Sequence, residues 1–234
     1  MAQRAPPLKK GRGFLFAFLR YERLARPTLV QRVARRVIGS DVIHVAVLPV
    51  PRRRLPQPDD AGLLLRTGPH AYTAFMGLGF DRQPAAEVLG DGAFDFVFLP
   101  VPRSADYKRG LAFLHGLDGA GYNYLSLFLA LMPRAFKTSH PHLPNWLTDE
   151  HPFFDSILAS SSSRPPTQEG DARIFCSQLG LLLCYACNAL PHHTMDPASC
   201  LPGELLELLV RDAGAVPYPS TQAFVVDADA LPEQ

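Results

Sequence analysis

Long apolar runs are missing from this chain, and no window approaches the roughly 20 apolar residues that a membrane-spanning helix needs. A secretory signal peptide is not expected either, because the apolar stretch at residues 14–19 is short and charged residues follow it at once. The chain has only four cysteines in 234 residues, which does not resemble the disulfide framework of a secreted protein. These absences predict a cytoplasmic protein, neither secreted nor held by a transmembrane segment.

Charge is also scarce, at 19% of the residues, but it is unevenly distributed. The first 54 residues contain 13 Lys and Arg and only two acidic residues, so they carry +11 in a chain whose net charge is +1. A segment this basic, residues 4–54, is suited to contact phosphate, an anionic membrane surface or an acidic partner, whereas no specific nucleic-acid binding is expected. The alternative is a solvated face that the acidic remainder of the same domain balances.

The pattern of apolar residues predicts a basic tail over residues 1–12 and a single domain over residues 13–234. Short helices interrupted by Pro27 are expected within residues 13–36, and a strand is expected over residues 41–48 with Pro49 as its end. Further strands are predicted at residues 62–66, 70–78, 94–99 and 223–227, and further helices at residues 105–117, 122–132, 176–190 and 201–211. Residues 160–170 are expected to form a loop. This order predicts the α+β class.

Cys176 opens the long apolar helix predicted for residues 176–190. A helix N-terminus lowers the pKa of a thiol, because its unpaired N–H groups and the helix dipole favour negative charge. The backbone N–H groups of Ser177 and Gln178 are also suited to stabilise an oxyanion. The alternative is that Cys176 is an ordinary buried cysteine, since cysteine is among the most frequently buried residues.

His44 lies within the predicted strand at residues 41–48, and it is the candidate base for the Cys176 thiol. Strand alternation places His44 on one face with Val42, Ala46 and Leu48, where the small Ala46 leaves room for a helix. A lone histidine in an apolar strand is, however, more often a satisfied core residue.

Four segments of the chain resemble the circularly permuted branch of the NlpC/P60 papain-like superfamily. They are residues 40–47 (SDVIHVAV), 119–124 (GAGYNY), 175–179 (FCSQL) and 201–206 (LPGELL), which occur in the family's order. The resemblance covers roughly residues 40–211 and extends to proteins of large DNA viruses, including the poxviral member, and to lecithin:retinol acyltransferase-like enzymes. It implies a permuted papain-like fold in which a small antiparallel sheet packs against the nucleophile helix.

The resemblance also implies the roles of individual residues. Cys176 would be the nucleophile, His44 the base, and Ser177, Gln178 and Tyr122 would line the oxyanion and substrate pocket. The family's third residue is a polar side chain on the next strand. It matches Thr73 here, where many members have Glu or His, and His70 is the chemical alternative.

The sequence therefore predicts a cysteine hydrolase or acyltransferase that acts on an amide- or ester-linked acyl group, with an acylated, amide-linked or lipid substrate. The rival hypothesis is an inactive interaction or scaffold protein on the same fold, for example a viral accessory protein. No cofactor is expected. A zinc site built from Cys184, Cys187, Cys200 and the His192-His193 pair is the less favoured alternative, because Cys184 and Cys187 lie inside an apolar helix.

Overall fold

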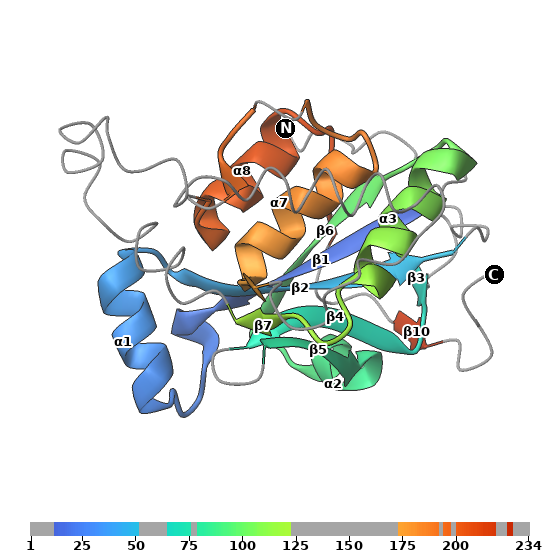
Figure 1. Ribbon diagram of the computed structural model, residues 1–234. Coiled ribbons are helices and arrows are strands. Elements are labelled where there is room, and N and C mark those ends of the chain that lie inside the picture. The colour runs from blue at the N-terminus through green and yellow to red at the C-terminus, as the bar shows by residue number, and fades with distance from the viewer. Residues whose placement is uncertain are drawn as a thin grey trace, which may run out of the picture.

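Six antiparallel strands form the central sheet of the protein, in the order β5-β4-β2-β1-β6-β9 (Figure 1). The computed structural model describes residues 12–51, 65–75, 79–122, 173–191, 194–197, 200–218 and 224–226. Helices α3, α7 and α8 cover one face of the sheet, and α2 lies against the other (Figure 1). This arrangement confirms the α+β class and the small antiparallel sheet.

Strand β1, Gly13–Arg20, is a central strand of the sheet, and the prediction of a helix at its position was wrong. Its aromatic-rich apolar run is buried on both faces, so it shows no alternation that would mark it as a strand. A short 3-10 helix, η1, Tyr21–Arg23, follows. The second half of the predicted region does form a helix, α1, Leu29–Ile38.

Strand β2, Val42–Val50, confirms the strand that carries His44 but continues beyond its expected end. Pro49 lies inside β2 and pairs with Phe14 of β1. Its carbonyl accepts a hydrogen bond from the Gly68 N–H at 3.0 Å. Proline therefore does not end this strand.

The other predicted strands and helices are present wherever the described residues include them. The strands are β3, Leu65–Thr67, β4, His70–Phe75, β6, Phe94–Pro100, and β10, Phe224–Val226. The helices are α3, Ser104–Gly116, α7, Cys176–Ala186, and α8, Pro202–Arg211. Helix α7 ends four residues before the predicted position. The helix predicted beyond Tyr122, the loop at residues 160–170 and residues 1–11 of the tail lie outside the described residues.

Several elements were not anticipated. They are β5, Gly79–Pro84, α2, Ala85–Gly90, β7, Gly121–Tyr122, β8, Arg173–Ile174, and β9, Val216–Tyr218. Strand β5 escapes prediction because its four last residues are polar or proline and are partly buried or exposed. The two short strands β7 and β8 pair in parallel and form a separate small sheet, and β3 and β10 form another.

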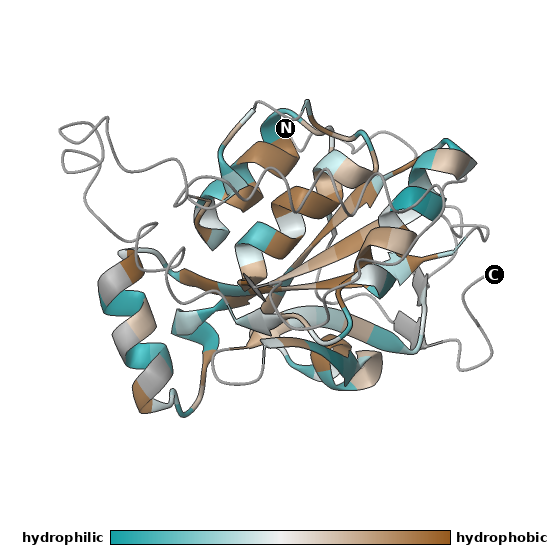
Figure 2. Ribbon diagram, in the orientation of Figure 1, coloured by the Kyte–Doolittle hydropathy of each residue, from teal (hydrophilic) through white to brown (hydrophobic). Residues whose placement is uncertain are grey.

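The two faces of β1 define two apolar clusters. Phe14, Phe16 and Phe18 pack under α3, α7 and α8, while Leu15, Ala17 and Leu19 belong to the cluster that includes α2. Figure 2 shows the apolar colour concentrated on the central strands and on α7. None of the helices within the described residues is long and apolar enough to cross a membrane.

Candidate active site

Cys176 is the first residue of α7, and three features place the helix start there. Phe175 is extended, with φ −119° and ψ 167°, so the helical conformation begins at the next residue. The Gln178 side-chain oxygen accepts a hydrogen bond from the Phe175 N–H at 3.3 Å and so satisfies a backbone donor at the helix start. Strand β8 immediately precedes α7 and anchors it through its pairing with β7.

The Cys176 thiol is only 6% exposed, and this burial determines its chemistry. Burial raises the pKa of Cys176 to about 11, because a thiolate loses its hydration there. Backbone hydrogen bonds from Val45 and Ser177 act in the opposite direction. The expectation that the helix N-terminus would lower this pKa is therefore wrong. The donors that favour the thiolate are present, but burial raises the pKa by more than they lower it. Cys176 is a neutral thiol at neutral pH.

His44 is half-buried on β2 and is fixed by two contacts. Its ring stacks on the Phe75 ring with a centroid distance of 4.8 Å and an interplanar angle of 20°. Its Nε2 lies 2.8 Å from the Thr73 hydroxyl oxygen. That hydroxyl also donates to the carbonyl oxygen of Val45 at 2.9 Å.

The Thr73 hydroxyl fixes the tautomer of His44. A hydroxyl has one proton, and a carbonyl oxygen can only accept, so the proton of Thr73 points to Val45. Thr73 must then accept from Nε2–H of His44, which leaves Nδ1 unprotonated. Burial lowers the pKa of His44 to about 4. The ring is therefore a neutral base at neutral pH, with Nδ1 as its basic atom.

Strand pairing decides which face of the sheet His44 occupies. His44 pairs with Leu19, whereas the next pair joins Arg20 to Val42, so Ile43 is an extra residue that forms a bulge. Leu19 belongs to the α2-side cluster, as does Ala46, while Val42 joins Val45 and Val47 on the α7 side. The expectation that His44 and Ala46 face the thiol helix, and that Val42 shares their face, is therefore wrong.

Cys176 and His44 approach the same stretch of β2 from opposite faces. The thiol lies on the α7 side, in reach of the Val45 backbone, and His44 is the preceding residue on that strand. Among the described residues, the hydrogen bonds of the His44 ring lead to Thr73 and do not include the Cys176 sulfur. The two reactive groups are thus adjacent to one backbone segment without being in direct contact.

The side chains of Ser177 and Gln178 both contribute to the structure of the helix start, and the Ser177 side chain also forms a hydrogen bond that lowers the pKa of Cys176. The Ser177 hydroxyl is fully buried and donates to the Cys200 carbonyl oxygen at 2.7 Å, which joins the start of α7 to the residues before α8. Gln178 caps the helix through its side-chain oxygen. An oxyanion site at this helix start would therefore use backbone N–H groups of the first turn.

Tyr122 and His70 occupy different positions relative to this centre. Tyr122 is half-buried in β7 and pairs with Ile174, two residues before Cys176, so the short β7–β8 sheet brings it to the start of α7. His70 is exposed at the beginning of β4. Thr73, three residues further along the same strand, is the side chain that hydrogen-bonds to the His44 ring.

The remaining cysteines do not form a metal site in the part of the chain that is described. Cys184, Cys187 and Cys200 are all buried, and burial raises the pKa of each, that of Cys187 to about 12. No group of three or more His, Cys, Asp or Glu side chains among the described residues is arranged to hold a metal ion. His192 and His193 lie outside the described residues.

Two contributors to the site were missed by sequence reasoning. Phe75, which stacks on His44, lies two residues after Thr73, so strand alternation placed both on one face and could have indicated it. Val45 contributes only backbone atoms, to Thr73 and to Cys176, and backbone contacts leave no mark in the sequence.

Comparisons of this chain with protein-family models, with curated proteins and with solved structures find no match. Functional inference therefore depends on the geometry of the site and on the four segments that carry the resemblance. Of these, residues 40–47 hold the start of β2, residues 175–179 the start of α7 and residues 201–206 the start of α8.

Proposed function

We propose that this protein is a cysteine hydrolase or acyltransferase with a permuted papain-like fold. Cys176 is the nucleophile and His44 the general base, and the substrate carries an amide- or ester-linked acyl group on a peptide, protein or lipid. The order of the segments, with the histidine strand before the thiol helix, supports the permuted NlpC/P60 assignment and the similarity to proteins of large DNA viruses.

The single observation that carries this proposal is the position of the Cys176 sulfur. It lies at the first residue of a helix and within hydrogen-bonding reach of the backbone of Val45, the neighbour of His44. A buried thiol beside helix N-terminal donors is suited to nucleophilic attack once a base removes its proton. The Thr73 hydroxyl supports the same reading, because it keeps Nδ1 of His44 free to act as that base.

The reaction follows from the two neutral groups. The proposed reaction requires the His44 ring to move from its present face of β2 to the thiol when substrate binds. Nδ1 of His44 then takes the proton of Cys176 while the sulfur attacks the acyl carbon. The imidazolium then gives this proton to the leaving amine or alcohol as its bond to the acyl carbon breaks. Water hydrolyses the resulting thioester, or an acceptor amine or alcohol takes the acyl group, with His44 removing the proton of the attacking group.

A second candidate is a catalytically inactive interaction or scaffold protein on the same fold. The observation that favours it is that His44 and Cys176 occupy opposite faces of β2 and share no hydrogen bond. Thr73 also differs from the charged residue expected in an active site of this kind, because a hydroxyl cannot neutralise an imidazolium as a carboxylate would.

The test is to trap the acyl-enzyme. The protein is incubated with p-nitrophenyl acetate at pH 7, and the acetylated residue is identified by peptide mass spectrometry in the wild type, His44→Gln and Cys176→Ser. We expect acetyl transfer to Cys176, lost in Cys176→Ser and reduced about a hundredfold or more in His44→Gln, since general-base catalysis contributes this much. His115→Gln is the matched control, because His115 is a partly buried histidine hydrogen-bonded to Tyr72.

Circular dichroism and thermal unfolding of each variant separate loss of chemistry from loss of fold. Acetylation of Cys176 that is equally fast in the wild type, His44→Gln and His115→Gln would contradict the proposal. An unreactive Cys176 in folded protein would contradict it as well, and both results would favour the inactive scaffold.

A further inference from the structure

Two consecutive side chains of β2, those of Ile43 and His44, lie on the same face of the sheet. His44 pairs with Leu19 of β1 and the next pair joins Val42 to Arg20, so Ile43 has no pairing partner of its own on β1. Ile43 belongs to the α2-side cluster, which also contains Leu19, the partner of His44. A regular strand alternates between faces, and two neighbours on one face therefore define a bulge.

Rotation of its side chain cannot bring His44 to the Cys176 thiol. The backbone of a strand fixes the face on which each side chain lies, so a residue changes face only when the register changes. A slip of the whole strand by one residue would move every core side chain of β2 to the other face, including Val45 and Val47, which are fully buried on the α7 side. The change of register must therefore be confined to the bulge.

A shift of the bulge by one residue along β2 meets this condition. Ile43 then pairs with Leu19, and His44 becomes the extra residue between Ile43 and Val45. Every apolar residue of β2 keeps its present face, and only His44 changes from the α2 side to the α7 side. In the shifted register His44 shares a face with Val45, whose backbone is within hydrogen-bonding reach of the Cys176 sulfur.

The contacts of β2 with β4 leave room for this shift. Among the described residues, the two strands pair through their backbones at Val47 and Tyr72, beyond the bulge. At the bulge itself β4 holds the His44 ring by side chains, through the Thr73 hydroxyl at 2.8 Å and the stacked Phe75 ring. The shift therefore changes backbone pairing with β1 alone and releases these two contacts of the ring.

We propose that Ile43 is a positioning residue, because it supplies a bulge that moves one residue along β2 and carries His44 from Thr73 to Cys176. The inference rests on the proposed function, since this movement is the step that brings the base to the nucleophile. The present register is the resting one, in which thiol and imidazole are kept apart. The shifted register is the competent one.

Disulfide trapping tests the movement without any catalysis. In His44→Cys, diamide oxidises the introduced thiol and the Cys176 thiol to a disulfide and is itself reduced to its hydrazine, and peptide mass spectrometry identifies the link. A disulfide needs Cβ atoms about 3.5–4.5 Å apart, so thiols that leave opposite faces of the sheet do not form one. We expect the link between position 44 and Cys176 to form.

Two further variants show whether the bulge is responsible. Ala46→Cys is the matched control, because position 46 lies on the α2 side of the same strand but outside the bulge, and its link to Cys176 should form about tenfold more slowly or not at all. Deletion of Ile43 in the His44→Cys protein should abolish the link, because a regular strand then holds position 44 on the α2 side.

A second measurement connects the movement with the chemistry. His44→Gln should slow acetylation of Cys176 by p-nitrophenyl acetate about a hundredfold when the bulge is present. In the protein that lacks Ile43 the same substitution should have no effect, because His44 no longer reaches the thiol. If Ile43 had only a structural role, its deletion would lower the rate but leave the effect of His44→Gln unchanged, and this result would overturn the inference.

The outcomes separate this inference from the proposed function. No link in His44→Cys, or an equally fast link in Ala46→Cys, would overturn the movement even if acetylation requires His44. A link at position 44 together with acetylation that does not depend on His44 would uphold the movement and contradict the catalytic role alone. Circular dichroism verifies the fold of each variant. The comparison of positions 44 and 46 needs no deletion, so it decides the question even if the protein without Ile43 does not fold.

Discussion

Helices α7 and α1 are nearly equal in length but differ in the burial of their described side chains. Every residue of α7 is buried, between the sheet and helices α3 and α8, whereas α1 has no buried side chain among those described. Both begin with a glutamine in the third helical position that hydrogen-bonds back to the residue before the helix. The same local signal therefore operates in two contexts. In α7 it caps a helix that carries a buried thiol, and in α1 it caps a helix whose described side chains are not buried.

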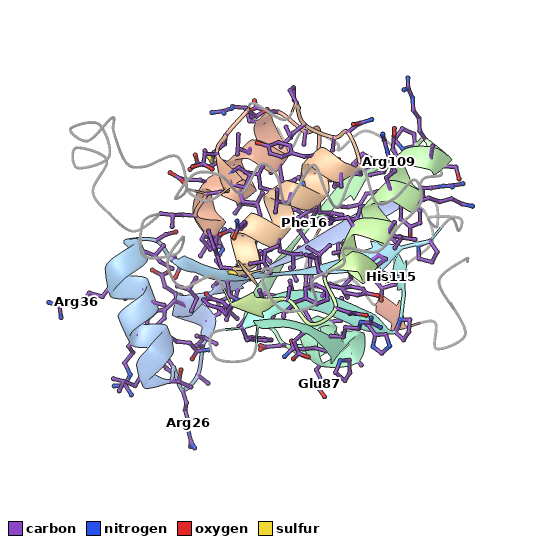
Figure 3. All side chains as sticks on the ribbon, viewed as in Figure 1. Phe16, Arg26, Arg36, Glu87, Arg109 and His115 are labelled. Carbon is purple, nitrogen blue, oxygen red and sulfur yellow. The ribbon has the colours of Figure 1, made fainter. Side chains whose placement is uncertain are left out.

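The largest expected effect is on the packing under α7. Phe16 is fully buried beneath this helix, and Figure 3 shows it between the sheet and α7. Phe16→Ala should lower the free energy of unfolding by about 3–5 kcal/mol, because it removes apolar contacts and leaves a cavity. The corresponding variant in α1 is Leu29→Ala, which should change the free energy of unfolding by less than about 0.5 kcal/mol. Urea unfolding measures both. Similar losses in the two variants would show that α1 is also part of the core.

Gly180 within α7 and Gly39, the residue that caps the end of α1, sharpen the comparison. A Cβ at Gly180 of α7 would lie 2.5 Å from Leu205 Cδ2 and 3.2 Å from Phe16 Cε1, so Gly180→Ala should destabilise the protein by about 1–3 kcal/mol through overpacking. Gly39 has open space but a left-handed backbone, so Gly39→Ala should cost about 1 kcal/mol through strain.

The two glycines respond differently to rescue. Gly39→Asn should recover most of the stability, because asparagine tolerates the left-handed region, whereas Gly180→Asn should be worse than alanine. Gly116→Ala is the control, since its Cβ would meet nothing within 4 Å and its backbone is not left-handed. Thermal unfolding of the variants measures these differences. A destabilised Gly116→Ala would show that the effects are not specific to packing or to backbone strain.

The paired glutamines give the closest match between the two helices. Gln178→Ala should destabilise by about 1–3 kcal/mol, because it leaves the buried Phe175 N–H without its acceptor. Gln31→Ala should cost about 0.5 kcal/mol, since water can reach the Thr28 N–H at the surface. Urea unfolding of both variants compares the same bond in two environments. Equal losses of unfolding free energy in the two variants would mean that burial does not control how much this hydrogen bond stabilises the protein.

The sequence predicted those parts of the fold in which local pattern and tertiary context agree. The alternation around His44, the apolar run of β6 and the periodicity of α3 each identified the correct element. Strand β1 was misassigned, because a short aromatic run buried on both faces has no distinguishing period. Strand β5 was missed, because its polar residues are those of a half-exposed edge strand.

The candidate site divides in the same way. The resemblance implied Thr73 as the partner of His44, with His70 as the alternative, and a hydrogen bond between Thr73 and His44 is present. The face that His44 occupies was predicted wrongly, because the bulge at Ile43 depends on pairing with β1, a strand that the sequence did not reveal. The direction in which the pKa of Cys176 shifts was also predicted wrongly. It depends on how far burial, which raises the pKa, outweighs the helix donors, which lower it.

The most direct test of the account is the pH dependence of Cys176 acetylation by p-nitrophenyl acetate, in the wild type and in His44→Gln. A neutral thiol with a pKa of about 11 that is deprotonated by a neutral imidazole requires only that His44 be unprotonated. Because burial lowers the pKa of His44 to about 4, the wild-type rate should be flat from pH 6 to pH 8 and fall as the pH drops through that value. The rate in His44→Gln should be far lower. A rate that rises about tenfold per pH unit over this range and is the same in both proteins, as for a simple thiolate, would contradict the account.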